Sequence, residues 1–136
     1  MSVRAKDRSV SIMEFLNNMH ELEILTIKLA MNEKYIPKRY RFVFAMPLME
    51  SVRKIGKNVT YGNSIYITKN DPASAIERRK RYFANAIIEI QNSFEIMRLA
   101  SEMLPVNENV LKEWTGRLLA EEKLLKGVMK SDKDRL

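Results

Sequence analysis

The sequence predicts an all-α protein, an antiparallel up-down-up-down four-helix bundle. Four segments carry apolar residues at steps of three and four, the spacing that gives a helix one apolar face, and none shows a sustained alternation of period two. Short connections separate the segments, which favours antiparallel neighbours. With 136 residues and 46% apolar content, the chain can bury one core. We expect a basic arm at residues 1–10, the bundle at 11–130 and a polar tail at 131–136.

The first helix is expected from about residue 11 to residue 34. Ser9 or Ser11 can cap its start, and Ser11 with Glu14 three residues later matches a capping box. The expected arm before it carries Arg4, Lys6 and Arg8. The apolar face of this helix consists of Ile12, Phe15, Leu16, Met19, Leu22, Leu25 and Leu29.

The second helix is expected from about Lys38 to Tyr66, with two irregularities. Pro47 lacks the backbone N–H that a helix interior requires, so we expect a kink near Met46. Glycine is a poor helix former, and Gly56 and Gly62 therefore predict a weak C-terminal half.

The third helix has the clearest boundaries in the chain. Asp71 followed by Pro72 suits the first turn of a helix, because an acidic cap accepts the free amides and proline has none to satisfy. Its end is expected before Leu104-Pro105, since proline disfavours helix in the residue before it. The apolar face consists of Ile76, Phe83, Ala86, Ile87, Ile90, Phe94, Met97 and Ala100.

The fourth helix is expected to begin at a cap, either Asn107 or Asn109. Gly127 and the polar tail from Ser131 weaken it toward its end. Its apolar face consists of Val110, Leu111, Trp114, Leu118, Leu124, Leu125 and Val128. Further apolar residues on the first and fourth helices lie off these faces and indicate either an oligomer interface or a wider core: Ile24, Ile27, Leu119 and Met129.

Positive charge is concentrated between Lys34 and Arg81. This stretch holds twelve basic and three acidic side chains, a net +9, against +7 for the whole chain. Such asymmetry in a small helical protein points to a polyanionic partner, most commonly nucleic acid. In an up-down bundle the third helix starts beside both chain termini, so the run Arg78-Arg79-Lys80-Arg81 joins the cations of the fourth helix at one end. The candidate binding residues are Lys38, Arg39, Arg41, Arg53, Lys57, Arg78, Arg79, Lys80, Arg81, Lys126 and Lys130.

The run at 78–81 also has a simpler interpretation. Four successive cations near a helix N-terminus oppose the helix dipole, at about 0.3–1 kcal/mol each when exposed. Arg and Lys are nevertheless good helix formers, and a charge run is often only a solvated face. Tyr40 and Tyr82, flanked by cations, are the best candidates for stacking on unpaired bases, although aromatic residues at helical spacing usually belong to the core.

Catalysis finds little support in the sequence. His20 is the only histidine and there are no cysteines, which excludes a zinc site or a cysteine-histidine pair. No phosphate-binding glycine motif is present. We therefore expect no enzyme activity and no cofactor. The absence of cysteine fits a cytoplasmic protein, residues 1–11 do not resemble a secretory signal, and no apolar stretch is long enough to span a membrane.

Several short segments resemble one family of small bacterial four-helix bundles. These are Tyr35 to Tyr40 (YIPKRY) between the first two helices, Asn63 to Tyr66 (NSIY), Glu77-Arg78-Arg79 at the start of the third helix, and Leu124 to Lys133 at the end of the fourth. The family includes proteins encoded in intervening sequences of 23S ribosomal RNA genes and the accessory variability determinants of diversity-generating retroelements. The resemblance covers roughly residues 12–133.

The resemblance implies a specific function. Accessory variability determinants are basic homopentamers that bind nucleic acid and the reverse transcriptase of the element, and they support mutagenic copying of a template RNA into cDNA. A similar protein here would bind RNA or DNA and a reverse transcriptase. The resemblance assigns these contacts to Arg39, Arg41, Arg53, Lys57, Arg78, Arg79 and Arg81. The alternative is a homo-oligomeric interaction protein of the ribosomal intervening-sequence type, which docks an acidic protein partner.

Overall fold

A computed structural model describes the backbone of residues 5–136 and the side chains of residues 14–136. The described residues form an all-α fold without β-strands, a helical bundle as predicted. Residues 1–4, including Arg4 of the expected arm, lie outside the described residues. The elements are α1 (Ala5–Ala30), the 3-10 turn η1 (Lys38–Tyr40), the π-helix η2 (Arg41–Ala45), α2 (Met46–Asn63), α3 (Pro72–Met103) and α4 (Glu108–Lys133).

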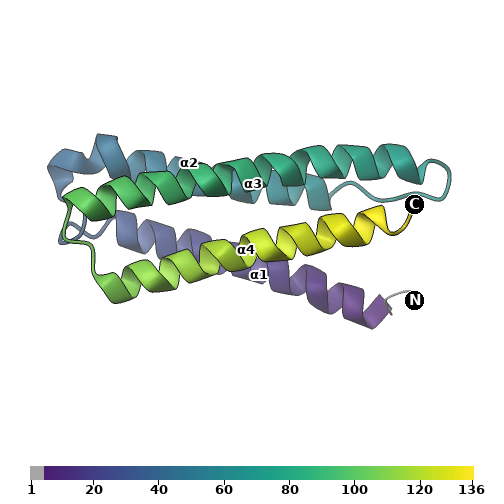
Figure 1. Ribbon diagram of the computed structural model, residues 1–136, viewed down its shortest axis with the longest axis horizontal. Helices are drawn as coiled ribbons and strands as arrows, with labels where there is room; N and C mark the ends of the chain where they lie inside the picture. Colours follow the sequence, from purple (N-terminus) through teal and green to yellow (C-terminus); the bar gives the residue numbers. More distant parts are fainter. Residues whose placement is uncertain (1–4) are drawn as a thin grey trace.

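The four long helices surround a single core. α1 packs against α2 and α4, and α3 packs against the same two helices. Figure 1 shows the start of α1, the C-terminus and the α2–α3 loop at one end of the molecule, on the right, and the α1–α2 and α3–α4 connections at the other. We call the right-hand end the terminal end. Phe15 of α1 and Phe83 of α3 meet edge to face in the core, with their ring centroids 6.2 Å apart.

The single tryptophan anchors α4 against α1. Trp114 is fully buried, and its indole Nε1 donates to Thr26 Oγ1 at 2.8 Å. The Thr26 hydroxyl in turn donates to the carbonyl oxygen of Leu22 at 2.6 Å. A buried indole N–H needs a partner, so this chain of hydrogen bonds lets the large ring contribute to the core without an unsatisfied donor.

The start of α1 differs from the prediction. The helix begins at Ala5, so Ser9 and Ser11 lie within it, and the predicted cap at either serine is wrong. Its end also comes earlier than residue 34, at Ala30. Residues 5–10 of the expected basic arm are therefore helical and continue α1.

The second predicted helix is divided at its proline. Pro47 lies in the first turn of α2 and cannot donate to the carbonyl of Val43, and the five residues before α2 form a π-helix instead of an α-helix. The kink expected near Met46 is this junction, and the helix ends at Asn63 instead of Tyr66. Phe44 in the π-helix is buried, whereas Phe42 is 78% exposed.

The glycines of α2 do not interrupt the helix, and Gly62 is a packing position. The helix continues through both Gly56 and Gly62, which are buried. A Cβ atom at Gly62 would lie 2.6 Å from Cε1 of Phe83, so only glycine lets that ring rest on the α2 backbone. At Gly56 the nearest atoms belong to the carboxyl end of the Glu23 side chain, which can move aside.

The caps of α3 and α4 confirm the sequence prediction. Asp71 accepts a hydrogen bond from the backbone N–H of Ser74 at 3.1 Å, and Pro72 follows it. Asn107, one of the two predicted alternatives, caps α4 by accepting from the N–H groups of Asn109 and Val110. α4 continues to Lys133, three residues past the predicted end of the bundle.

Candidate nucleic-acid interface

Exposed cations gather at the terminal end of the bundle. They come from the α2–α3 loop, from the first turns of α3 and from the last turns of α4, which lie together at the right of Figure 1. Lys126, one turn further back on α4, is exposed but pairs with Glu122 at 3.1 Å. The exposed cations of this end include Lys69, Arg78, Lys80, Arg81, Lys130 and Lys133, with Arg135 just after α4.

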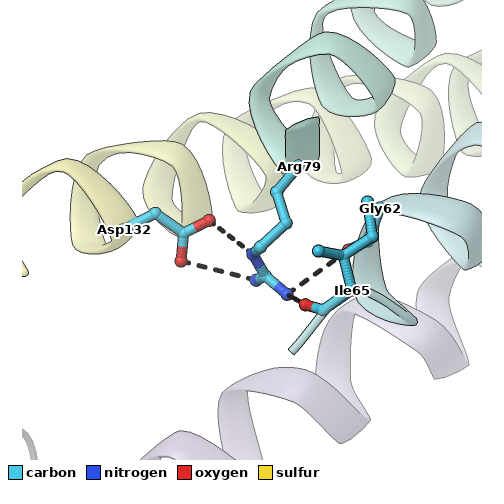
Figure 2. A network of polar contacts seen from close by, with 4 residues as sticks. All are labelled: Gly62, Ile65, Arg79 and Asp132. Carbon is cyan, nitrogen blue, oxygen red and sulfur yellow. Dashed lines mark hydrogen bonds and ion pairs between the residues drawn. The ribbon is translucent and has the colours of Figure 1, made fainter. Parts of the chain in front are cut away.

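Arg79 is the exception within the basic run, because its side chain faces inward. Figure 2 shows its guanidinium between α4 and the end of α2. Nε donates to Asp132 Oδ2 at 2.8 Å and Nη2 donates to Oδ1 at 3.4 Å. Nη1 donates to the carbonyl oxygens of Gly62 and Ile65, at 3.3 and 2.9 Å. The guanidinium carbon also lies 5.3 Å from the centroid of the Phe83 ring.

These contacts give Arg79 a structural position. The side chains of Arg79 and Asp132 are only 12% and 8% exposed. The planar guanidinium satisfies a carboxylate and two carbonyls at once, which a lysine could not do. Arg79 therefore joins the last turn of α4 to the α2–α3 loop, and the exposed cations of the run are its three neighbours.

A hollow opens beside this network, between the end of α2 and the start of α3. It encloses about 560 Å³ and contains two arginines and two tyrosines. The rings of Tyr61 and Tyr82 meet edge to face, with centroids 5.7 Å apart. We call this feature the Arg-Tyr hollow; its lining residues are Tyr61, Ser64, Ile65, Arg78, Arg81, Tyr82 and Asn85.

The remaining candidate cations lie elsewhere. Lys38, Arg39 and Arg41 belong to η1 and η2, at the opposite end of the molecule in Figure 1. The guanidinium carbon of Arg39 lies 5.1 Å from the centroid of Tyr40, and Arg41 approaches Glu33 at 3.8 Å. Tyr40, a predicted stacking residue, is half-buried and stacks on Phe44.

Arg53 and Lys57 lie on exposed positions of α2, one turn apart. Arg53 borders a hollow between α1 and α2, on the side of α2 that faces Glu23. Burial raises the pKa of Glu23, while the positive charges of Arg53 and His20 oppose that rise. The structure therefore does not bring the predicted candidates together in one patch. It separates them into the terminal end, the side of α2 and the η1–η2 corner.

Glu121 is a buried acid that is not among the residues predicted from the sequence as a site. Glu121 is fully buried between α1 and α4, and Asn18 Nδ2 donates to its Oε2 at 3.1 Å. Oε1 has no hydrogen-bond partner among the described residues. Burial raises the pKa of Glu121 to about 7, against the smaller opposing effect of the Asn18 hydrogen bond.

The described side chains contain no group of three or more His, Asp or Glu residues placed to hold a metal ion. Among the helices of residues 5–136, none is long and apolar enough to cross a membrane. No protein-family model, curated protein or solved structure matches the chain.

Proposed function

We propose that the chain is an antiparallel up-down-up-down bundle that binds nucleic acid through its terminal end, without a catalytic role of its own. The observation that carries the proposal is the placement of Arg78 and Arg81. Both are exposed, both border the Arg-Tyr hollow, and neither forms an ion pair with a side chain between Glu14 and Leu136. Arginines placed in this way can bind phosphate groups.

The resemblance extends the proposal to a partner and a process. We propose an accessory subunit of a diversity-generating retroelement that positions template RNA for its reverse transcriptase. The η1–η2 corner supports a separate protein contact, because it exposes Phe42 and Val43 beside Lys38 and Arg39. Arginine and aromatic side chains are enriched in protein interfaces. Nucleic acid and polymerase would thus bind opposite ends of the bundle.

Self-association is part of the same proposal, with a homopentamer implied by the resemblance. A second hollow, of about 500 Å³, lies between α3 and α4 and is lined mainly by apolar side chains. Phe94 and Leu119 line it and are exposed. We propose that this hollow contacts a second copy of the chain.

Binding of a structured RNA at two salt concentrations tests the nucleic-acid function. Counterion release predicts that a protein making 6–10 phosphate contacts loses about 10³–10⁵-fold in affinity between 50 and 200 mM salt. Unchanged affinity across this range, or no binding at either salt, would reject the proposal. Purification at low salt gives a simple first indication, since bound nucleic acid raises the ratio of absorbance at 260 nm to that at 280 nm.

A pair of charge-reversed variants locates the contact. Arg78→Glu/Arg81→Glu should abolish RNA binding, whereas Lys38→Glu/Arg39→Glu changes the net charge equally at the other end and should retain most of it. Arg79 is left intact, because its loss would disturb the fold. Equal losses in the two variants would show that binding follows net charge and not the terminal end. If only an acidic protein binds, the alternative interaction-protein function is favoured.

A further inference from the structure

We infer that the Arg-Tyr hollow is a subsite for an unpaired nucleotide of a single-stranded nucleic acid, with the base against the tyrosines and the flanking phosphates on the arginines. This inference rests on the proposed nucleic-acid function and specifies its ligand. The hollow's volume of about 560 Å³ lies within the range of about 300–1,000 Å³ typical of small-molecule pockets. It is therefore large enough for one flat ring and its neighbouring groups.

The two tyrosines provide the stacking surface. Tyr61 is 51% exposed and Tyr82 is 36% exposed, so neither ring is part of the core. Their planes cross at 68°, an edge-to-face arrangement that fixes the two rings without covering both faces of each. A base can stack on a face that remains open, and this contact is tolerant of sequence because every base has a π-face.

The polar residues of the hollow complement a nucleotide. Arg78 and Arg81 are three positions apart on α3, so they lie on the same side of the helix. Their guanidinium groups can bind phosphate oxygens on either side of a stacked base. The amide of Asn85 offers both a donor and an acceptor to the edge of the base.

Packing inside the bundle holds the hollow in shape. The contact between Gly62 and Phe83 brings α2 and α3 together, and the tyrosines are the residues immediately before these two. Arg79 donates a hydrogen bond to the backbone carbonyl of Ile65, and Ile65 lines the hollow. A preformed site loses less entropy on binding than a flexible loop. Arg79 is therefore a positioning residue of this subsite.

The combination of groups distinguishes single strands from other polyanions. An acidic peptide would use the arginines but has no flat ring for the tyrosines. Within a duplex the bases are stacked on one another and cannot reach a side-chain ring, whereas single-stranded segments present theirs. The subsite should therefore add affinity for single strands over duplexes.

Fluorescence anisotropy with the full chain tests the inference. The probes are labelled 12-nucleotide single strands of RNA and of DNA, and a 12-base-pair duplex. Tyr82→Leu and Tyr61→Leu each keep an apolar side chain but remove the stacking face, and should weaken single-strand binding by about 5- to 100-fold. Duplex binding should change less than twofold. Far-UV circular dichroism checks that each variant is folded. If one tyrosine variant does not fold, the other is used for the test.

Tyr66→Leu is the matched control. Tyr66 is 83% exposed in the adjoining α2–α3 loop, but it does not line the hollow, so its variant should bind every probe like the wild type. A probe with 2-aminopurine should also be quenched by the wild type and less so by Tyr82→Leu. The RNA and DNA arms identify which strand binds more tightly.

The possible outcomes separate the inference from the function on which it rests. If no probe binds at any salt concentration, the nucleic-acid function itself fails. If the wild type binds but the Tyr61, Tyr82 and Tyr66 variants bind equally well, the function stands and the stacking subsite is rejected. Polyglutamate can also be used as a competitor of the single-stranded probe. If it displaces the probe equally well from the wild type and from the Tyr61 and Tyr82 variants, the hollow binds charge alone and the stacking subsite is likewise rejected.

Discussion

Glu121 is a carboxyl group in the core that is unfavourable when it is ionised. It is fully buried, and only one of its two carboxylate oxygens is hydrogen-bonded, by Asn18. Burial disfavours the charged form and raises the pKa of this carboxyl to about 7. Near neutral pH the folded protein is therefore a mixture of molecules in which the Glu121 carboxyl is protonated and molecules in which it is ionised.

The shift predicts a pH dependence of stability. Between pH 4.5 and about 7 the folded state retains a proton that the unfolded chain has lost, so stability falls as pH rises through this window. At about 1.4 kcal/mol per pKa unit, ionised Glu121 costs on the order of 3 kcal/mol above pH 7. Glu121→Gln should therefore stabilise the protein by up to about 3 kcal/mol at pH 8 and have little effect at pH 4.5.

Urea unfolding at both pH values measures this effect. Glu113→Gln, an exposed residue on the same helix, is the control and should change stability equally at the two pH values. If the benefit of Glu121→Gln is as large at pH 4.5 as at pH 8, the carboxyl does not titrate as described.

The Arg79–Asp132 pair predicts a second effect on stability. Asp132→Asn keeps the shape of the side chain but removes the charge opposite a mostly buried guanidinium. A buried charge that loses its partner is costly, so we expect a loss of about 1–3 kcal/mol in the free energy of unfolding. Asp134→Asn, an exposed neighbour, should stay within about 0.5 kcal/mol of the wild type in the same urea titration. Equal effects of the two substitutions would contradict a structural role for the network.

These inward-facing charges had a signal in the sequence. Arg79 lies three residues after Ile76 and four before Phe83, on the apolar face of α3. Glu121 lies between Leu118 and Leu125 with the same spacing. The periodicity that predicts the core thus also places these two side chains in it. It could not identify their partners, because Asp132 and Asn18 come from distant parts of the chain.

α2 and α3 can pack closely because small residues lie where the two helices meet. Ser51 and Ser93 hydrogen-bond at 2.7 Å, and Gly62 admits the ring of Phe83. We expect Gly62→Ala to cost about 1–3 kcal/mol, because the added Cβ overlaps a fully buried ring. Gly127→Ala meets no atom within 4 Å and should instead stabilise α4 by up to about 1 kcal/mol.

Thermal unfolding of this pair of variants measures the two opposite effects. The substitution is the same in both, so helix propensity alone would stabilise both proteins. Stabilisation by Gly62→Ala would therefore show that Phe83 can move and that the close approach is not required.

At the level of elements, local chemistry explains what the sequence predicts well. The starts of α3 and α4 depend on a side chain that caps amides two or three residues away; the sequence predicts Asp71 for α3 and includes Asn107 as one of two alternatives for α4. α4 continues three residues past the predicted end of the bundle at residue 130, and Asp132 in its last turn pairs with Arg79, 53 positions away. The side chains that approach the glycines of α2 also lie on other helices, so the sequence does not reveal them.

The molecule as a whole carries surfaces of different chemical character. Exposed cations occupy the terminal end, the η1–η2 corner combines cations with Phe42, and apolar hollows lie along two sides. The positive charge of residues 34–81 is divided among separate surfaces, as a bundle predicts, because the fold sends its two halves to opposite ends. The predicted candidates retain exposed positions with the exceptions of Arg79 and Arg41, which is half-buried.

Self-association should involve the side formed by α3 and α4. Leu119 is exposed on the hollow there, beside Phe94, and an apolar pair of this kind is stabilised by removal from water. Leu119→Gln should therefore shift the protein toward smaller species in sedimentation equilibrium, with unchanged helicity. Ile27→Gln is the matched control, because Ile27 is exposed on the smaller hollow between α1 and α2. If Ile27→Gln dissociates the protein and Leu119→Gln does not, the subunits meet through α1 and α2. If the wild type is a monomer, neither surface mediates self-association.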